Sequence, residues 1–355
     1  MDFLNLFTPK AVAANYTEAA SNKIPYFGAS LFPAKKKAGL DLAWFQGAGG
    51  LPVSLAPTAF DAKATFRSIG NVTKVETEMP FFREGFLISE KDRQELIRAY
   101  DANDPYIQAV IDRIFDFTNN LVEGAEVVAE RMRMSLLFPS GGDVKITFKA
   151  NGVAYEYNYD SASAWKTSNY SSLTTTALWS APSTADPIKD FMTMADKAAS
   201  VSGSVVRYAV MSNDTFNKMI ATEAVKNRWL SASGIKAGYL TPGDATSAIE
   251  SATGITPVVY TKKYKDESGT VASFVPDGYV TFIPEGNLGS TWYGTTPEEA
   301  DLMRKPDTEV SVVNTGVAIT RIIKEHPVNT EILASEIVLP SYERMNEVVT
   351  LKVTA

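Results

Sequence analysis

One long helix, predicted from residue 104 to residue 138, constrains the fold more than any other feature of this sequence. Apolar residues recur through it at steps of three or four, which places them along one face of a helix. The stripe consists of Ile107, Ile111, Ile114, Phe117, Leu121, Ala125, Val128 and Met132. Asp104 and Pro105 favour its start, and the run from Phe138 to Gly142 favours its end. Such a helix is about 50 Å long, more than the width of a small domain, so the segments around it decide its role.

Length and composition predict a two-domain globular protein. With 355 residues, the chain exceeds the usual size of a single hydrophobic core. Its 45% hydrophobic and 21% charged residues are typical of a soluble protein. No apolar run is long enough to span a membrane, and the first residues lack the basic and apolar regions of a secretory signal. We therefore expect no membrane partner.

Cysteine and histidine usage excludes several classes of site. The absence of cysteine removes disulfides, thiolate catalysis and iron–sulfur ligation. His326 is the single histidine, which excludes zinc sites built on several imidazoles, and we expect it to be solvated or structurally hydrogen-bonded. The net charge of −7 argues against wholesale wrapping of nucleic acid. The basic run from Lys35 to Lys37 is expected to be a solvated corner or a local contact.

Two segments before the helix lack a core of their own. Residues 1–33 are rich in apolar side chains but interrupted by prolines, so we expect this arm to pack against another part of the protein. A partner subunit is the simplest candidate, and docking within the same chain is the alternative. Residues 39–82 are expected to form a long two-stranded arm, with strands at Asp41–Gln46 and Ala62–Arg67 and an alternating stretch at Asn71–Thr77. Isolated hairpins are marginal in water, so this arm also needs a neighbour.

Residues after the helix predict a mixture of strands and helices. A hairpin is expected around Asn151-Gly152, followed by a surface connection over residues 161–178. Further on, the pattern is typical of a compact α+β domain, and strands return from residue 330 to residue 353. The predicted helices begin at Asp186-Pro187 and cover Asp214–Trp229 and Pro242–Ala252; the predicted strands are Val205–Met211, Pro257–Tyr260, Tyr279–Ile283 and Val310–Ile323 with a break near Gly316; Lys262–Thr270 is a charged loop.

No motif predicts a catalytic, cofactor-binding or metal site. The glycines of Gly47–Gly50 follow a strand, but no helix follows to hold a phosphate. Residues 265–269 have too few oxygen ligands for a calcium loop. Scattered tryptophans indicate cores or interfaces rather than a platform for bases.

Paired carboxylates on the long helix are the one constellation that catalysis could use. Asp112 with Asp116, and Glu126 with Glu130, are each four residues apart, and a glycoside hydrolase uses such acid–base pairs. Interleaved arginines instead favour ion pairs on a solvated, intersubunit or interior surface. That charged surface is expected to include Asp112, Asp116, Glu126, Glu130, Arg131 and Arg133.

The order of these segments resembles the major capsid protein of tailed bacteriophages, which has the Hong Kong 97 fold, and in particular the coat-protein family typified by phage lambda. The similarity covers essentially the whole chain. It is carried by the tryptophan and Asp-Pro region Trp179–Ile188, the late strand and loop Phe282–Glu298, the hairpin Asp143–Asp160, and the closing strands His326–Val353.

The resemblance implies an α+β capsid fold with five parts. These are an amino-terminal arm (1–38), an extended two-stranded loop (39–82), a peripheral domain (83–184) with the spine helix (104–138), an axial domain (185–325), and returning strands of the peripheral domain (326–355). The extended loop would lie over a neighbouring subunit, with the arm beneath it. Rings of such subunits need two different complementary surfaces.

The same resemblance implies a structural function without catalysis. The chain would form hexamers and pentamers of an icosahedral phage head that encloses double-stranded DNA, as a virion component assembled in the host cytoplasm. Its partners would be other copies of itself, a scaffolding protein, a portal, a decoration protein, and packaged DNA bound non-specifically. No cofactor is expected.

Three alternatives stay open at this stage. One is a cellular nanocompartment shell of the same fold, and another is a carboxylate-dependent hydrolase in which the paired carboxylates line a pocket. The third concerns covalent crosslinks between a loop lysine and a peripheral-domain asparagine, as in some members of the fold. The residues available for them are Lys63, Lys74, Asn329 and Asn346. We expect these four to be surface residues without a covalent role, because relatives of the lambda type are held non-covalently.

Overall fold

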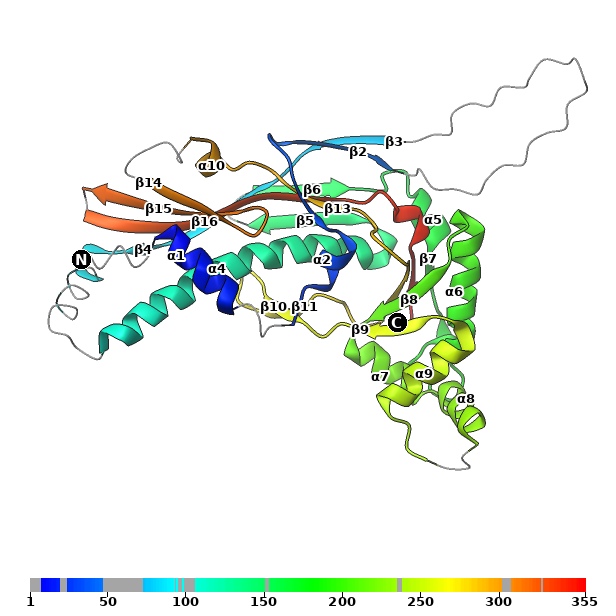
Figure 1. Ribbon diagram of the computed structural model, residues 1–355. Coiled ribbons are helices and arrows are strands. Elements are labelled where there is room, and N and C mark those ends of the chain that lie inside the picture. Colours follow the sequence, from blue (N-terminus) through cyan, green and yellow to red (C-terminus); the bar gives the residue numbers. More distant parts are fainter. Residues whose placement is uncertain are drawn as a thin grey trace, which may run out of the picture. The chain divides into compact units, whose positions relative to one another are not determined.

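The fold consists of two compact units, each assembled from segments far apart in the sequence (Figure 1). The computed structural model describes residues 8–19, 24–46, 73–92, 94, 98, 106–150, 153–234, 238–301, 308–326 and 328–355. The first unit combines residues 1–42, 76–132 and 290–341; the second combines residues 43–75, 133–289 and 342–355.

The first unit is built on a sheet around one long strand. Its strands are β1 (Ala34–Lys36), β4 (Phe81–Ile88), β13 (Ser290–Tyr293), β14 (Thr308–Val313), β15 (Val317–Glu325) and β16 (Val328–Ser341). β16 pairs antiparallel with β4, β13 and β15, while β1 pairs in parallel with β13. The strand-like segment predicted with a break near Gly316 is the β14–β15 hairpin. Glycine is required there, since a Cβ would overlap the Tyr293 ring.

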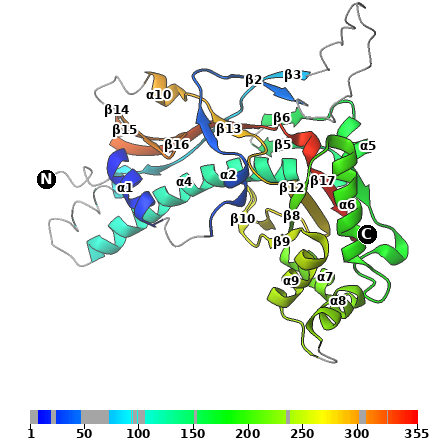
Figure 2. The same ribbon diagram turned by 45° about the vertical axis from the view of Figure 1, so that its right-hand side comes forward.

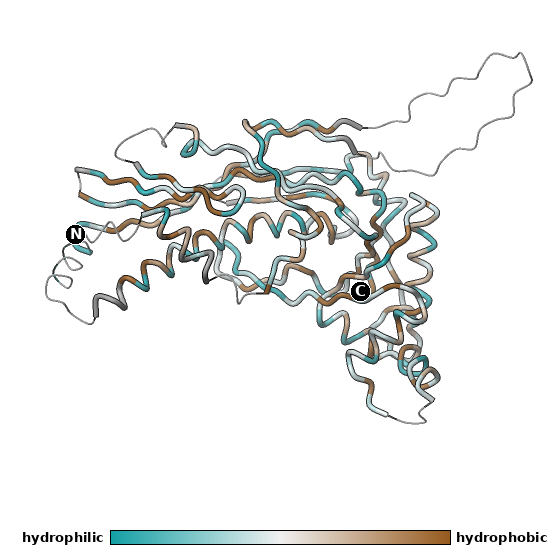
Figure 3. The backbone as a smooth tube through the Cα atoms, in the orientation of Figure 1, coloured by the Kyte–Doolittle hydropathy of each residue, from teal (hydrophilic) through white to brown (hydrophobic). Residues whose placement is uncertain are grey.

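The predicted long helix is confirmed as α4 (Tyr106–Leu137), which continues for 32 residues (Figures 1 and 2). Ile114 of the predicted stripe shares a buried cluster with Ile319 of β15 and Ile332 of β16, and Ile111, Leu121 and Ala125 pack against it. Val122, which was not predicted as part of the stripe, is also buried in this cluster. Hydrophobic residues recur along α4 and along these strands (Figure 3). Alternation with period two on the strands and 3.6 on the helix therefore produces one common core.

Phe117 departs from the predicted stripe, because its side chain is 48% exposed. The ring lies 6.1 Å from the ring of Phe86, and the guanidinium of Arg113 lies 5.5 Å from its centroid. An arginine on the same helix thus partly covers a ring that the sheet does not bury. The side chain of Ile107, another predicted member of the stripe, lies outside the described residues.

Gly124 is a weak point of α4 and gives a first prediction. No atom outside the helix backbone would come within 4 Å of a Cβ added at this position. Replacing Gly124 by alanine is therefore expected to raise the free energy of unfolding by about 1 kcal/mol, because glycine loses more backbone entropy on forming a helix. Urea unfolding of the isolated subunit measures this difference. An unchanged or lower stability would contradict this prediction.

The amino-terminal arm contains two helices that were not predicted, α1 (Pro9–Ala19) and α2 (Phe27–Leu31). Val12 and Tyr16 of α1 are buried in the same cluster as the α4 stripe. The arm therefore docks within its own chain at these residues, which is the second of the two accounts left open above.

The extended arm begins as predicted with strand β2 (Asp41–Gln46), which pairs with β3 (Thr73–Glu78). From Thr73 onward, the alternating stretch predicted at Asn71–Thr77 is β3; its first two residues lie outside the described residues. The strand predicted at Ala62–Arg67 and the glycine tip at Gly47–Gly50 lie outside the described residues.

The described part of the second unit contains a five-stranded sheet and, after the first strand of that sheet, the helices α6 to α9. The strand order is β7 (Tyr170–Ser172), β17 (Val349–Lys352), β12 (Tyr279–Pro284), β8 (Val206–Met211) and β9 (Thr256–Val259). The helices are α6 (Pro187–Ser202), α7 (Asn213–Ala221), α8 (Glu223–Ser233) and α9 (Pro242–Thr253). Asp186 caps α6 as its Asp-Pro signal predicts, with Oδ1 accepting from the Lys189 N–H at 3.1 Å.

A predicted helix and a predicted loop in this unit need correction. The single helix expected at Asp214–Trp229 is divided into α7 and α8 at Thr222, whose backbone is extended (ψ 145°) and whose hydroxyl donates to the Met219 carbonyl at 2.8 Å. That side-chain bond replaces a helical one. The charged loop Lys262–Thr270 instead contains strand β10 (Lys263–Lys265), which pairs with β11 (Val271–Ser273).

The segments next to α4 are more ordered than expected. The predicted hairpin is confirmed as β5 (Lys145–Ala150) with β6 (Val153–Asn158). The surface connection predicted over residues 161–178 contains helix α5 (Ala164–Asn169) and β7. Trp165 is buried and its Nε1 donates to the Met345 carbonyl at 2.9 Å, so this segment is partly core.

The closing strands divide between the two sheets. β16 belongs to the first unit, whereas β17 pairs with β12 and β7 in the second. Likewise β14 and β15, which fall in the range predicted for the axial domain, pair within the sheet of β16 and β4. The domain ranges themselves stay a prediction.

Candidate functional site

The paired carboxylates of α4 do not form an acid–base site. Asp112 and Asp116 are exposed. Glu126 is half-buried and accepts a 2.7 Å hydrogen bond from Nδ2 of Asn314, in the turn between β14 and β15. Glu130 is completely buried and accepts from the Gly28 N–H at 2.9 Å. Glu126 and Glu130 therefore have different partners, and Asp112 and Asp116 are exposed and line no described pocket.

The prediction of a charged surface on α4 was partly wrong. Glu130 is 0% exposed and Arg133 is 2% exposed, so neither belongs to a solvated or intersubunit surface. Asp112 and Asp116 are exposed, and Glu126 and Arg131 are half-buried. Burying a charged group is costly unless it is hydrogen-bonded, and the contact of Glu130 with the amino-terminal arm supplies such a bond.

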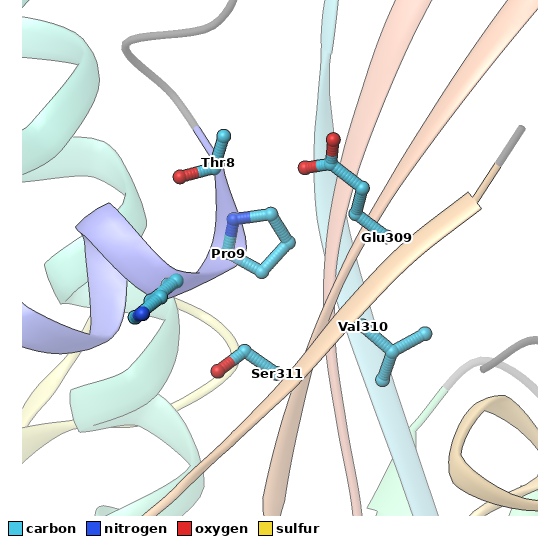
Figure 4. Close-up of a pocket in the computed structure, with 6 residues that line it drawn as sticks. Thr8, Pro9, Glu309, Val310 and Ser311 are labelled. Carbon is cyan, nitrogen blue, oxygen red and sulfur yellow. The ribbon is translucent and has the colours of Figure 1, made fainter.

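An open groove of about 540 Å³ lies between the start of α1 and strand β14 (Figure 4). It is lined by Thr8, Pro9, Lys10, Glu309, Val310 and Ser311. Its one carboxylate, Glu309, is bound by the buried Arg321 at 2.9 Å. None of the four α4 carboxylates lines this groove, so the hydrolase alternative has no support from it. Among the described residues, no group of acidic or histidine side chains is arranged to hold a metal ion.

The base of the extended arm is held by a set of specific hydrogen bonds. β1 pairs with β13 just before the arm begins, and the Lys37 N–H donates to the Tyr293 carbonyl at 2.8 Å. On the returning side, the Met79 N–H donates to the Leu40 carbonyl at 2.9 Å, and β4 then joins β16. Both ends of the arm are thus fixed to one sheet by backbone hydrogen bonds.

Helix α10 (Pro297–Asp301) fastens this base with two carboxylates. Glu298, 2% exposed, forms an ion pair with Arg83 of β4 and accepts a 3.0 Å bond from the Ser335 hydroxyl. Glu299 binds Lys36 of β1 at 2.7 Å. The helix therefore connects the strand that precedes the arm with the strand that follows it.

The start of α10 is a capping box. The Thr296 hydroxyl accepts from the Glu299 N–H at 3.3 Å, and the Glu299 carboxylate accepts in return from the Thr296 N–H at 3.3 Å. The spacing Thr-x-x-Glu signals this arrangement in the sequence. Thr296 lies in the late loop on which the family resemblance is based, and Glu299 directly follows that loop.

In the second unit, Arg344 fastens the other end of that late loop. Its Nε and Nη2 bind both carboxylate oxygens of Glu347, at 2.9 and 2.6 Å. Nη1 donates to the carbonyls of Glu285 and Asn287, at 3.1 and 3.0 Å. The hydrogen bond from Arg344 lowers the pKa of Glu347 below its ordinary value. The turn after β12 is thereby fixed to the segment that leads into β17.

Trp179 lies in the core of the second unit. It is completely buried, and its Nε1 donates to Oδ2 of Asp190 at 2.8 Å. Its ring is stacked 6.3 Å from that of Phe191, which meets Phe282 edge-on at 5.0 Å. The tryptophan and Asp-Pro region thus forms part of the core rather than a ligand site.

Asp190 gives a pH-dependent prediction. Burial raises its pKa above the ordinary value, although the Trp179 hydrogen bond opposes this. The folded state therefore binds the proton more tightly than the unfolded state, and this group's contribution to stability falls as pH rises from about 4. Replacing Asp190 by asparagine keeps an acceptor for Trp179 and is expected to remove that slope. Urea unfolding of both proteins at a series of pH values above about 4 measures how the free energy of unfolding changes with pH. The same change with pH in both proteins would contradict this prediction.

The remaining predicted residues lie apart from one another. His326 is exposed in the turn after β15, as expected for a solvated histidine. Asn329 is 7% exposed and Asn346 is half-buried, so neither is a freely exposed surface residue. Lys63 and the side chain of Lys74 lie outside the described residues. The run from Lys35 to Lys37 makes local contacts, as expected: Lys35 lies over the Trp292 ring at 5.2 Å, and the other two bind Glu299 and the Asp41 carbonyl.

A family model matches nearly the whole chain. The family model described as "Phage major capsid protein E" matches residues 11–353. A comparison with curated proteins finds no match. In the part of the chain that the structure describes, no helix is long and apolar enough to cross a membrane.

Solved structures share the fold over nearly the full length. The putative capsid protein of a prophage of E. coli CFT073 has a TM-score of 0.59 and 14% identity, covering 98% of this chain and 99% of that chain. A phage-related protein from Bordetella bronchiseptica RB50 gives 0.55 and 12%, covering 97% of each chain. The capsid asymmetric unit of cyanophage A-1(L) gives 0.51 and 10%, covering 95% and 98%.

The fold is therefore that of the Hong Kong 97-like capsid proteins, and the contacts described above hold structural elements together. The chain belongs to the phage major capsid protein E family. It is a structural protein of an icosahedral bacteriophage shell and not an enzyme.

Proposed function

We propose that this chain forms hexamers and pentamers of a phage head that encloses double-stranded DNA. The observation that carries the proposal is the family match over residues 11–353, which spans both units. The family supports a virion component that associates with copies of itself. Assembly in the host cytoplasm, with a scaffolding protein, a portal and a decoration protein as further partners, is part of the same proposal.

We assign roles to the parts of the chain by the elements they contain. The sheet of β4, β14, β15 and β16 with α4 would form the peripheral domain. The sheet of β8, β9, β12 and β17 with α6 to α9 would form the axial domain, with its loops at the centres of hexamers and pentamers. The two-stranded arm that begins with β2 would lie over a neighbouring subunit. Its firmly bonded base supports this role, because an arm that grips a neighbour must transmit force to its own body.

The assembled subunits are expected to be held together without covalent crosslinks. The low exposure of Asn329 and the half-burial of Asn346 leave neither side chain freely available to a lysine of a neighbour. Purified particles that are boiled in denaturant should therefore run as a single band of 38.6 kDa on a gel. Ladders of dimers and larger species would contradict this expectation.

Particle contents separate the phage head from a cellular nanocompartment. A net charge of −7 suits a shell that encloses DNA without gripping its phosphates. Particles purified from infected or induced cells should contain double-stranded DNA, and isolated subunits should not bind duplex DNA strongly at physiological salt. Particles filled with a cargo protein would favour the nanocompartment, and tight DNA binding would contradict the explanation of the charge.

Co-expression with a scaffolding protein tests whether the chain forms shells. Sedimentation and negative-stain electron microscopy should show shells, tubes or rings of six. A strictly monomeric species, even with the scaffold present, would overturn the proposal.

A further inference from the structure

Residues 27–37, here called the strap, run from α4 to the sheet of the first unit. At one end the Gly28 N–H donates to Oε1 of Glu130 on α4, at 2.9 Å. At the other end Thr291 of β13 binds two successive strap carbonyls: its hydroxyl donates to the Phe32 carbonyl at 2.8 Å, and its N–H donates to the Pro33 carbonyl at 2.9 Å. β1 then pairs with β13.

The hydrogen bond between Glu130 and Gly28 lies in the interior of the first unit. The glutamate side chain is completely buried, although 102 residues separate it from Gly28. Desolvating a carboxylate is costly unless donors replace the lost water, and the Gly28 N–H is one such donor. Between the two anchoring points, the side chains of Leu31 and Phe32 are buried, with 8% and 0% exposed, whereas Ala29 and Ser30 are exposed.

The strap leads directly into the extended arm. Lys37 follows β1, and its Nζ donates to the Asp41 carbonyl at the start of β2, at 2.7 Å. The residues from which the arm departs are thus continuous with the strap and, like it, are bonded to β13. The strap is bonded to α4 at Gly28 and to β13 at Phe32 and Pro33, and it continues into the arm.

We propose that Glu130 is a positioning residue for assembly: it fastens the strap to α4 and so sets the direction in which the extended arm leaves the subunit. This inference rests on the proposed function for its consequence in the shell, but the fastening itself is a property of the single subunit. The partner it serves is a second copy of this chain, onto which the arm is laid.

Hydrogen exchange on the isolated subunit tests the fastening. Glu130→Ala is expected to increase exchange of the Gly28 amide on the order of tenfold, with faster exchange along the rest of the strap, because the amide loses its acceptor. Glu130→Gln retains an acceptor oxygen and should preserve most of the protection. Glu126→Ala is the matched control, since it removes a carboxylate one turn earlier that binds Asn314 and not the strap. Unchanged Gly28 exchange in a folded Glu130→Ala protein would overturn the proposal.

A second variant keeps the test valid if Glu130→Ala does not fold. Thr291→Val removes the hydroxyl that binds the Phe32 carbonyl at the opposite end of the strap. It is expected to raise the amide hydrogen exchange of the strap, while the amides of α4 remain protected from exchange. Uniform exchange across the strap and α4 in this variant would mean that the strap has no separate fastening.

Electron microscopy of the same variants tests the consequence for assembly. Glu126→Ala should assemble like the unmodified chain, whereas Glu130→Ala should give fewer closed shells and more irregular ones. Normal shells from a Glu130→Ala protein whose strap is released would overturn the positioning role. If the unmodified chain and the control also fail to form shells, the proposed function fails instead, and the exchange result on the fastening stands by itself.

Discussion

Replacing Trp179 by alanine is expected to lower the free energy of unfolding by about 3 to 5 kcal/mol, the range found when a large aromatic side chain is removed from a core. The ring is completely buried, and it stacks on Phe191, which in turn meets Phe282 of β12. Its loss would also leave Asp190 without the indole donor. Urea unfolding of the isolated subunit, followed by circular dichroism, measures this change.

Trp179→Phe separates packing from hydrogen bonding. Phenylalanine retains an aromatic ring in the core but cannot donate to Asp190, so its cost should be smaller than that of alanine. Since a half-buried carboxyl then lacks a donor, we expect a loss of about 1 to 3 kcal/mol. If both variants unfold at the same urea concentration as the unmodified chain, Trp179 is not part of a continuous core.

Replacing Gly142 by alanine is the second change with a large expected effect. Gly142 has φ +83°, and a Cβ there would lie 2.9 Å from the Tyr170 ring and 2.9 Å from Cγ of Lys166. The left-handed backbone and the overlap together are expected to lower the free energy of unfolding by about 2 to 4 kcal/mol. Chemical denaturation of the purified subunit measures it.

Gly141 is a matched control for this prediction. Its φ of +61° also disfavours alanine, but no atom would lie within 4 Å of an added Cβ. Gly141→Ala is therefore expected to cost about 1 kcal/mol, from the backbone alone. Equal losses at both positions would show that contact with Tyr170 and Lys166 contributes nothing.

Local sequence signals predicted several individual elements. The apolar spacing and stop signal placed α4 to within two residues at its start and one at its end, and Asn151-Gly152 located the β5–β6 hairpin. These features depend on short-range geometry, which the sequence records directly. The division of one predicted helix at Thr222 also has a local cause, a side-chain bond that competes with the helix.

Features that depend on distant segments were not predictable in the same way. Glu130 follows the same helical spacing as Glu126, yet it is buried because the strap, about a hundred residues earlier, crosses it. The division of the closing strands between two sheets is set by pairing with β12 and β15, which helical or strand periodicity does not encode. The capping box at Thr296 and Glu299 could have been recognised from its spacing, but not the ion pairs that α10 makes with β1 and β4.

A cryo-electron-microscopy reconstruction of particles assembled from this chain tests the central claim most directly. The account predicts a closed icosahedral shell in which every hexamer and pentamer position is filled by one copy of the chain, with the arm that follows β2 laid on an adjacent subunit. A chain that remains monomeric with its scaffold, or that forms closed particles only as a minor guest in a shell made of another protein, would contradict it.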